Sequence, residues 1–235
     1  GSLGETIAMT GLGTRDAAAF LHQAGSTPVE HAFTACEGAW ATDETGHRFL
    51  DFHGNSCHNI GYRHPKLIAA LKEQLDTLCF TPRLFTSEPA VELAEMLAAR
   101  WPYGAAKVLL GVSGADAIEM ALKLAYIATG RTGTAAFDGS WHGAALGTLS
   151  VGGTASERAG FPTLENCHHA PSYWPRRQGE DAETCARNAL DSLKQILGSN
   201  EIAALIAEPV RSTGQTAPGW VWPEIRTLCD STGTL

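Results

Sequence analysis

The residues with the clearest chemical potential lie in the stretch 108–125, which reads VLLGVSGADAIEMALKLA. Apolar residues precede Gly111, and apolar residues recur at helical spacing after Gly114, so the pattern predicts a strand over 108–110, a tight turn and a helix. The first N–H groups of such a helix have no partner within the helix, and the helix dipole favours an anion beside them. The turn around Ser113 is therefore suited to binding a phosphate through its backbone.

The same letters also satisfy G-x-S-x-[GA], the pattern of a nucleophilic serine in hydrolases. A hydrolase using Ser113 needs an acid and then a histidine downstream, and Asp138 with His142 or His168 has that order. The pair His53-Gly54 is similar to the oxyanion loop of lipases. Asp138 follows Ser113 too closely for that fold, however, so we favour the anion-binding turn over the nucleophile.

Three histidines, His53, His58 and His64, lie close together in the sequence and are candidates for a metal site. No two of them are spaced i, i+4 on a helix, and no carboxylate is placed to complete a zinc set. Loop histidines more often make ordinary hydrogen bonds, so we expect no metal here.

Composition limits the class of protein. The chain has 235 residues, of which 44% are hydrophobic, enough for a packed core. Its formal net charge is −8 and its lysines and arginines are scattered, which argues against a nucleic-acid or anionic-membrane surface. We therefore expect a small-molecule partner, with no nucleic acid and no membrane.

The cysteines and the apolar segments indicate the compartment. Six cysteines are spaced widely and irregularly, with no C-x-x-C pair, so we expect them to be reduced. No stretch approaches the length of a membrane span, and no charged and apolar leader opens the sequence. These features predict a cytoplasmic protein.

In the N-terminal part of the chain, the sequence predicts a hairpin, a loop and then two helices. Residues 1–30 predict an extended arm or a short helix, and residues 30–52 predict a hairpin whose turn contains Gly46. A loop rich in glycine, histidine and asparagine follows. Helical spacing of apolar residues then begins at Pro65, and Ser87 is a candidate N-cap for a second helix.

Strands and helices alternate in the second part. A short strand is predicted before the glycine-rich segment around Trp141, and the region 162–179 is expected to be irregular. Residues 182–197 have helical periodicity, and the run IAALIAEPV is typical of a buried parallel strand. This alternation predicts an α/β fold.

The last predicted helix begins at Pro223 and ends at Gly233. In a βαβ unit the helix returns the chain to the sheet, so a strand should follow it. We therefore expect that the sequence stops partway through a domain.

The candidate functional residues fall in loops that follow predicted strands, and such loops converge on one crevice in an α/β sheet. The turn at Ser113, the aromatic Trp141 and the strand-end Glu208 would meet there. A planar ring whose phosphate rests on the turn could stack on Trp141. In the alternative interpretation, Trp141 packs at a domain edge and Glu208 pairs with an arginine.

Six segments, in order between about residues 30 and 235, resemble class III pyridoxal-phosphate (PLP) aminotransferases of fold type I. They are FLDFHGNSCHNIGYRHPKLIAALKEQL, FTSEPAVELAEML, GVSGADAIEMALKLA, GSWHG, IAALIAEPV and LCDSTGTL. The resemblance implies an α/β, mixed and mostly parallel sheet in a large domain, with a smaller N-terminal segment. Residues 1–62 would then form an arm and hairpin of the small domain, and residues 63–235 the first part of the large PLP-binding domain. It also implies a homodimer with the active site at its interface.

The resemblance implies PLP as cofactor and places its contacts residue by residue. The matching positions, from the phosphate-binding motif through the ring-stacking segment to the strand-end glutamate, are Ser113, Gly114, Ala115, Trp141, His142, Gly143 and Glu208. Ala115 stands where a serine or threonine is usual, so the backbone would supply the phosphate donors there. Trp141 stands where tyrosine or phenylalanine is common, which keeps the stacking.

The family's pyridine-binding aspartate and Schiff-base lysine would both fall after Leu235. None of the five lysines present stands at the family's position, and most lie on polar faces of predicted helices, where lysine is usually solvated. These lysines are Lys66, Lys72, Lys107, Lys123 and Lys194. We therefore expect no catalytic residue within the chain and no transamination by these residues alone.

The segment EPVRSTG departs from the family, in which many amino-acid transaminases read closer to EPIQ-x-EGG. Thr213 replaces the second glutamate, which pairs with a substrate-binding arginine, and Arg211 introduces a cation. A guanidinium matches carboxylate or phosphonate oxygens, so we expect Arg211 to contact an anionic substrate, together with Asn55. The alternative is that Arg211 pairs with a surface acid.

The implied reaction is amino transfer between an amine or amino acid and a keto acid, in which the cofactor acts as electron sink. Elimination competes when a leaving group occupies the next carbon. FHGNSCHNIGY and EPVRS resemble the branch of ammonia-lyases that act on aminoethylphosphonate compounds. Two alternatives of other classes stay open: a serine hydrolase using Ser113, and a chain that binds a partner or cofactor without turnover.

Overall fold

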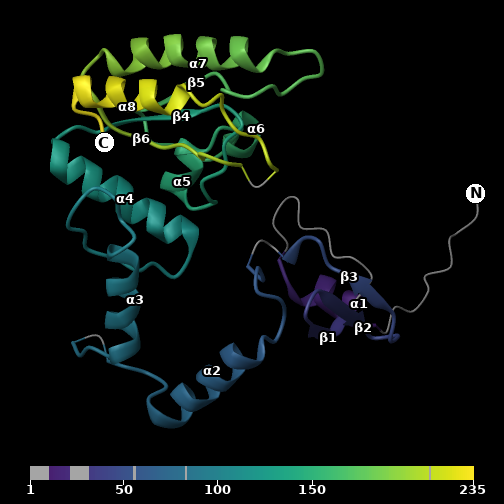
Figure 1. Cartoon of the computed structure of the whole chain (residues 1–235). Coiled ribbons are helices and arrows are strands. Elements are labelled where there is room, and N and C mark those ends of the chain that lie inside the picture. Colours follow the sequence, from purple (N-terminus) through teal and green to yellow (C-terminus); the bar gives the residue numbers. More distant parts are fainter. Residues whose placement is uncertain (1–10, 22–31, 55–56, 83, 212) are drawn as a thin grey trace, which may run out of the picture. The chain divides into compact units, whose positions relative to one another are not determined.

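The computed structural model describes residues 11–21, 32–54, 57–82, 84–211 and 213–235. The chain divides into two compact units, Gly1–Val91 and Glu92–Leu235 (Figure 1). Each unit is described by itself.

The first unit contains a short helix and an antiparallel three-stranded sheet. The helix α1 (Leu12–Ala19) agrees with the short helix predicted for the N-terminal region. The strands β1 (Phe33–Glu37), β2 (Trp40–Asp43) and β3 (Arg48–Leu50) pair in the order β1-β2-β3. The predicted hairpin is thus correct for β2 and β3, whereas its first run divides into two strands. Gly38, with a φ of 57°, provides the extra turn.

The predicted loop and the two helices that follow it are confirmed. Helix α2 (Pro65–Thr77) has its proline in the first turn, and α3 (Glu88–Ala98) begins directly after Ser87. The apolar face predicted for α2 exists, but its side chains are exposed: Leu71 is 51% accessible and Leu75 64%.

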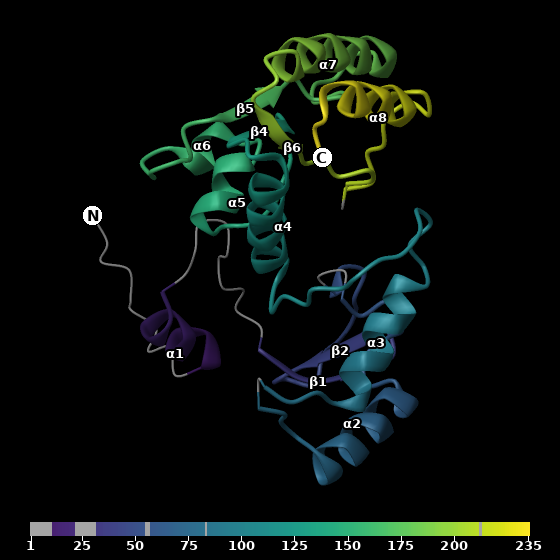
Figure 2. The same cartoon turned by 90° about the vertical axis from the view of Figure 1, so that its left-hand side faces the viewer.

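The second unit is a three-stranded parallel sheet covered by helices on both faces (Figure 2). Its strands are β4 (Gly133–Phe137), β5 (Cys167–Ala170) and β6 (Ile202–Leu205), in the order β5-β4-β6. The helices are α4 (Gly114–Thr129), α5 (Leu146–Val151), α6 (Ala155–Arg158), α7 (Ala182–Leu197) and α8 (Val221–Thr232). The predicted α/β class is confirmed.

Side-chain alternation along β4 assigns each sheet face to its own helices. Phe137 packs in the larger core cluster with residues of α7 and α8, among them Leu193 and Ile225. Ala136, on the opposite face, packs with Leu122 of α4 and Val151 of α5. A parallel sheet buried on both faces explains why every residue of β4 is inaccessible to solvent.

Three sequence predictions for this unit are wrong. Residues 108–110 form no strand, since no described strand pairs with them, and Leu109 is 61% exposed. The region 162–179 is not wholly irregular, because β5 lies within it. The glycine-rich segment after β4 is also more than a loop, because it leads into the short helices α5 and α6.

The end of the described chain lies beside the sheet. Helix α8 ends at Gly233 in the left-handed conformation, as predicted. The N–H of Leu235 then donates to the carbonyl of Ala203, and the carbonyl of Leu235 accepts from the N–H of Leu205. The main chain after α8 thus begins to pair with β6, where the sequence predicted a strand.

None of the helices in the described part of the chain combines the length and the hydrophobicity that a bilayer crossing requires. All six cysteines lie within the described residues, and none of them forms a disulfide there.

Candidate functional site

Ser113 is the N-cap of α4. Its Oγ accepts a hydrogen bond from the N–H of Asp116 at 3.1 Å, and the Asp116 carboxylate accepts one from the N–H of Val112 at 3.1 Å. These reciprocal bonds resemble a capping box and fix the turn before the helix. Gly114 is exposed, and a Cβ built there meets nothing within 4 Å. The start of α4 is therefore rigid, with open space at Gly114.

The loop after β4 is pressed against the first turn of α4. Gly143 has a φ of +126°, and a Cβ added to it would lie 2.8 Å from the Cβ of Ala115 and 2.9 Å from Thr148 Oγ1. Only glycine fits this approach without displacement of its neighbours. The structure thus brings together Ala115 and Gly143, two residues that the sequence predicted to share a site.

Trp141 and Glu208 are joined by a hydrogen bond. The main-chain N–H of Trp141 donates to Oε1 of Glu208 at 2.7 Å, which ties the loop after β4 to the segment after β6. The Trp141 ring is 54% exposed. These observations place Ser113, Trp141 and Glu208 in loops of one unit, each next to the end of a helix or strand.

His142 follows Trp141 but is buried, with 7% of its surface accessible. Its Nε2 has no hydrogen-bond partner among the described residues. Burial is the main cause that lowers the pKa of His142, and the nearby Arg211 and His169 lower it further, while Glu208 acts in the opposite direction. Burial thus favours the neutral imidazole, and its buried Nε2 has no partner among the described residues.

Arg211 lies beside Glu208 and is only partly exposed. Its Nε is 3.7 Å from Glu208 Oε2, and the two side chains are 19% and 20% exposed. The guanidinium carbon lies 4.6 Å from the ring centroid of Trp174, a cation–π contact. Arg211 Nε is another buried atom without a hydrogen-bond partner in the described chain.

Two functional neighbours, Tyr173 and Trp174, were not predicted from the sequence. The Tyr173 hydroxyl donates to the main-chain carbonyl of Glu208, and burial raises the pKa of Tyr173 to about 12. Both residues belong to the region that the sequence analysis expected to be irregular. The two adjacent aromatic residues were a signal in the sequence, but their position after a strand was not, because strand β5 was not predicted.

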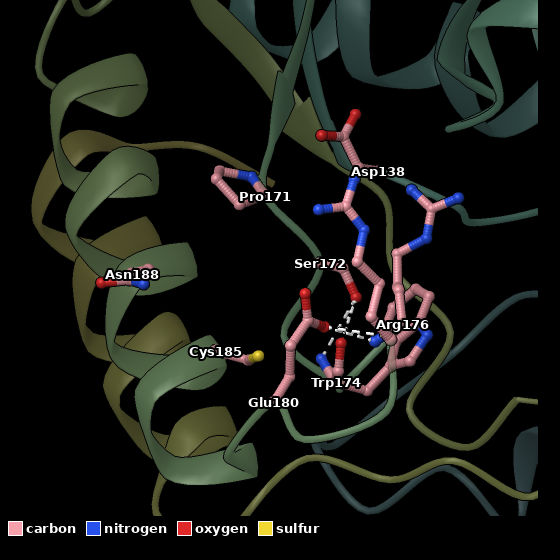
Figure 3. A pocket seen from close by; sticks show the side chains of 9 residues that line it. Asp138, Pro171, Ser172, Trp174, Arg176, Glu180, Cys185 and Asn188 are labelled. Atoms are coloured by element: carbon pink, nitrogen blue, oxygen red, sulfur yellow. Dashed lines mark hydrogen bonds between the residues drawn. The ribbon is translucent and has the colours of Figure 1, made fainter.

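A cavity of about 520 Å³ opens beside Trp174 (Figure 3). Figure 3 shows Asp138 at the end of β4, Glu180 near the start of α7 and Arg176 in the loop between β5 and α7. Glu180 Oε2 accepts hydrogen bonds from the N–H groups of Arg176 at 2.7 Å and Arg177 at 3.1 Å. These bonds close a turn in the loop just before α7, and this loop lines the cavity together with Trp174.

The alternative hydrolase site is not assembled. Ser113 Oγ is engaged at the N-cap, and no described hydrogen bond joins it to His142 or Asp138. Asn55 lies outside the described residues. All five lysines are exposed, and no described group of three histidine, cysteine or acidic side chains is arranged to hold a metal ion.

Known proteins resemble this chain over most of its length. It is 39% identical to an (R)-1-hydroxy-2-aminoethylphosphonate ammonia-lyase from Vibrio splendidus, over 92% of this chain and 49% of that protein. It is 35% identical to a 5-aminovalerate aminotransferase from Pseudomonas aeruginosa, over 85% of this chain and 48% of that protein.

A solved structure shares both fold and sequence with it. An amine transaminase from an uncultivated Pseudomonas species, determined in its PLP-bound form, superposes with a TM-score of 0.82 at 32% identity. The match covers 92% of this chain and 54% of that one. The predicted transferase fold is therefore confirmed.

The family model of class III aminotransferases matches residues 21–235, nearly the whole sequence. The chain spans about half the length of the curated relatives it matches. It belongs to the class III aminotransferase family.

Proposed function

We propose that this chain forms the cofactor-binding part of a PLP-dependent aminotransferase. The observation that carries the proposal is the joining of three segments in one unit: Gly143 lies against Ala115 at the start of α4, and Trp141 hydrogen-bonds to Glu208 after β6. Such a meeting of loops around a helix N-terminus suits a phosphorylated planar ligand.

The residues present fit that ligand. The N–H of Asp116 is bound by Ser113 Oγ. This leaves the N–H groups of Gly114 and Ala115 at the start of α4 for a ligand, and the space at Gly114 is open. The exposed ring of Trp141 offers a stacking face. The unpaired Nε2 of buried His142 is a polar atom that a ligand could satisfy. We assign Ser113, Gly114 and Ala115 to the phosphate, and Trp141, His142, Gly143 and Glu208 to the ring.

When bound, PLP supplies an electron sink that makes the C–H next to the substrate nitrogen acidic. The chain contributes binding and orientation. The start of α4 would hold the phosphate and Trp141 would stack on the ring, while Glu208 fixes the loop that carries Trp141 through its hydrogen bond to the backbone. His142 stays neutral because it is buried, so it adds no charge beside the ring.

The substrate in this proposal is an amine or amino acid that carries an anionic group, with a keto acid as amino acceptor. Arg211 would bind the anionic group, since its guanidinium lies near Glu208 and its Nε has no partner in the described chain. Asn55 remains a predicted second contact.

A second candidate reaction is ammonia elimination. A relative that is 39% identical is named an ammonia-lyase of a hydroxy-aminoethylphosphonate, whose phosphonate would suit Arg211. The two reactions differ in their products. Amino transfer needs a keto acid and forms a new amino acid, whereas elimination releases ammonia without any acceptor.

Other parts of the proposal follow from the family. We propose a cytoplasmic homodimer with the active site at its interface, and a division into residues 1–62 of the small domain and residues 63–235 of the large one. Sedimentation of the purified protein tests the dimer.

The stacking role of Trp141 can be tested by substitution. Trp141→Ala should weaken PLP binding about tenfold, because ring stacking and burial are lost. Trp101→Ala is the matched control, since Trp101 in the same unit is 55% exposed and forms an edge contact with Tyr103. The readout is the dissociation constant from an absorbance titration with PLP. Equal affinities of the two variants would contradict the assignment.

A further inference from the structure

Two adjacent aromatic residues in the loop after β5 hold the two ends of the segment from Glu208 to Arg211. The Tyr173 hydroxyl donates to the main-chain carbonyl of Glu208. The ring of Trp174 faces the guanidinium of Arg211, whose carbon lies 4.6 Å from the ring centroid. The loop after β5 therefore contacts both the backbone of Glu208 and the guanidinium of Arg211.

Trp174 is itself fixed. It is 3% exposed, and its ring makes an edge contact with Tyr173 at 4.5 Å between centroids. The Ser172 hydroxyl donates to the carbonyl of Trp174 at 2.6 Å, and the N–H of Trp174 donates to the same hydroxyl at 3.3 Å. Its side chain thus lines the cavity of Figure 3 in one orientation and presents a fixed face to Arg211.

The contact with Trp174 restrains the guanidinium without using its hydrogen-bond donors. The guanidinium carbon lies over the Trp174 ring, and the attraction of a cation to a ring face does not require an N–H donor to find an acceptor atom there. The Glu208 carboxylate is 3.7 Å from Arg211 Nε, longer than a hydrogen bond, and Nε has no other partner in the described chain. Donors of Arg211 are therefore held in place for an anion.

We propose that Trp174 is a positioning residue that determines specificity for an anionic substituent of the substrate, acting through Arg211. The inference rests on the proposed function, because it assigns the substrate's anion to Arg211. Without Trp174, the Arg211 side chain gains rotational freedom and must lose it again on each binding event. The affinity for charged ligands should fall, while the affinity for uncharged ligands should not change.

The experiment uses the full-length holoenzyme and two non-reactive probes, ethylphosphonate as the anion and 1-propanol as an uncharged probe of similar size. Trp174→Leu should raise the dissociation constant for ethylphosphonate about tenfold, measured by calorimetry, and leave that for 1-propanol unchanged. Trp174→Phe keeps an aromatic face and should give a smaller rise, and it serves as the test variant if the leucine variant does not fold.

Trp220→Leu is the matched control. Trp220 also packs against an arginine, with the guanidinium carbon of Arg187 5.2 Å from its ring, but that pair involves α7 and not Arg211. This variant should bind ethylphosphonate as the unmodified protein does. The loss of ethylphosphonate affinity caused by Trp174→Leu should also vanish when Arg211→Gln is already present, because Trp174 acts on the anion only by positioning Arg211.

Two results would overturn the proposal. In the first, Trp174→Leu weakens the binding of ethylphosphonate and 1-propanol equally. In the second, Trp174→Leu weakens ethylphosphonate binding by the same factor when Arg211→Gln is already present. Either would mean that Trp174 only supports packing. Failure of the proposed function gives a different signature, since the protein would then bind no PLP in any variant.

Discussion

Arg211 has lost most of its contact with water, and its side chain makes no close hydrogen bond to any residue that the structure describes. Its charge is balanced by Glu208 at 3.7 Å and by the face of Trp174. A charge so placed contributes little by itself to folding, because desolvation offsets the attraction. The presence of a partly buried charge at this position is better explained by a bound anion, for which the charge and the N–H donors of Arg211 are already in position.

Arg211→Gln should therefore reduce kcat/KM for an anionic amine by about tenfold to a hundredfold, the range for losing a hydrogen bond to a charged group. An uncharged amine should lose much less. Arg226→Gln is the control, because Arg226 pairs with Asp230 on the exposed face of α8. Steady-state kinetics with both amines gives the answer, and an equal loss for the two amines would contradict this role of Arg211.

His142 makes folding stability depend on pH. Burial lowers its pKa from the ordinary value of 6.5, so the unfolded chain binds more protons than the folded one between the two pKa values. The free energy of unfolding should thus decrease as the pH falls below about 6.5, by up to about 1.4 kcal/mol per pH unit for one such group. His142→Gln should make this decrease shallower.

Urea denaturation at a series of pH values measures that slope. The exposed His168 provides the matched variant, His168→Gln, which should retain the slope of the unmodified protein. His169 is also partly buried with a lowered pKa, so part of the slope should persist in the His142 variant. A slope unaffected by His142→Gln would contradict the assignment.

At the scale of single residues, the sequence predicted which residues lie near one another better than it predicted their side-chain contacts. Glu208 and Trp141 were placed near each other because both follow strands, and a hydrogen bond joins them. The pairing of Arg211 with Trp174 could not be predicted, since it depends on how two loops from different strands fold over the sheet. The alternative that Arg211 pairs with an acid is partly correct, but that acid is Glu208 at the candidate site.

The elements follow local signals where those signals are strong. Helix α7 begins and ends where periodicity predicted, and its N-cap Asp181 accepts a hydrogen bond from Thr184 at 2.8 Å. Strand β5 was missed because Cys167, His168 and His169 have no strand-like alternation, and the strand exists through its parallel pairing with β4. The opposite error occurred at 108–110, where a strand was predicted and none forms. Apolar residues form a strand only where a neighbouring strand can pair with them.

The contact between the loop after β4 and helix α4 can be tested at Gly143. Gly143→Ala should destabilise the protein by about 2 to 4 kcal/mol, because a left-handed backbone and a 2.8 Å clash with Ala115 add together. It should also weaken PLP binding, since the start of α4 must shift. Gly104→Ala separates the two causes: Gly104 has a φ of +99° but open space around its Cβ position.

Denaturant unfolding and PLP titration are the two measurements for this pair of variants. The alanine at position 104 should cost only the backbone strain, about 1 kcal/mol, and leave PLP affinity unchanged. If both variants lost the same stability and the same affinity, the close approach of Gly143 to Ala115 would have no special role.

At the scale of the whole molecule, the two units differ in how much of their apolar surface is buried. The second unit has two apolar clusters around its sheet, whereas helix α2 of the first unit has no buried residue. Helix α3, which spans the boundary between the units, has no buried residue either. The sequence predicted the amphipathic helices correctly because periodicity is local. It could not predict that their apolar side chains are exposed, since burial depends on contacts between residues far apart in the sequence.

The central claim is that the site around Ser113, Trp141 and Glu208 serves PLP. Its most direct test is the absorption spectrum of the protein purified from its complete gene, combined with the intact mass before and after borohydride reduction in the presence of PLP. We predict a near-visible absorption band and a mass gain of one reduced cofactor. Absence of both the band and the mass gain, with added PLP and a folded protein, would contradict the claim.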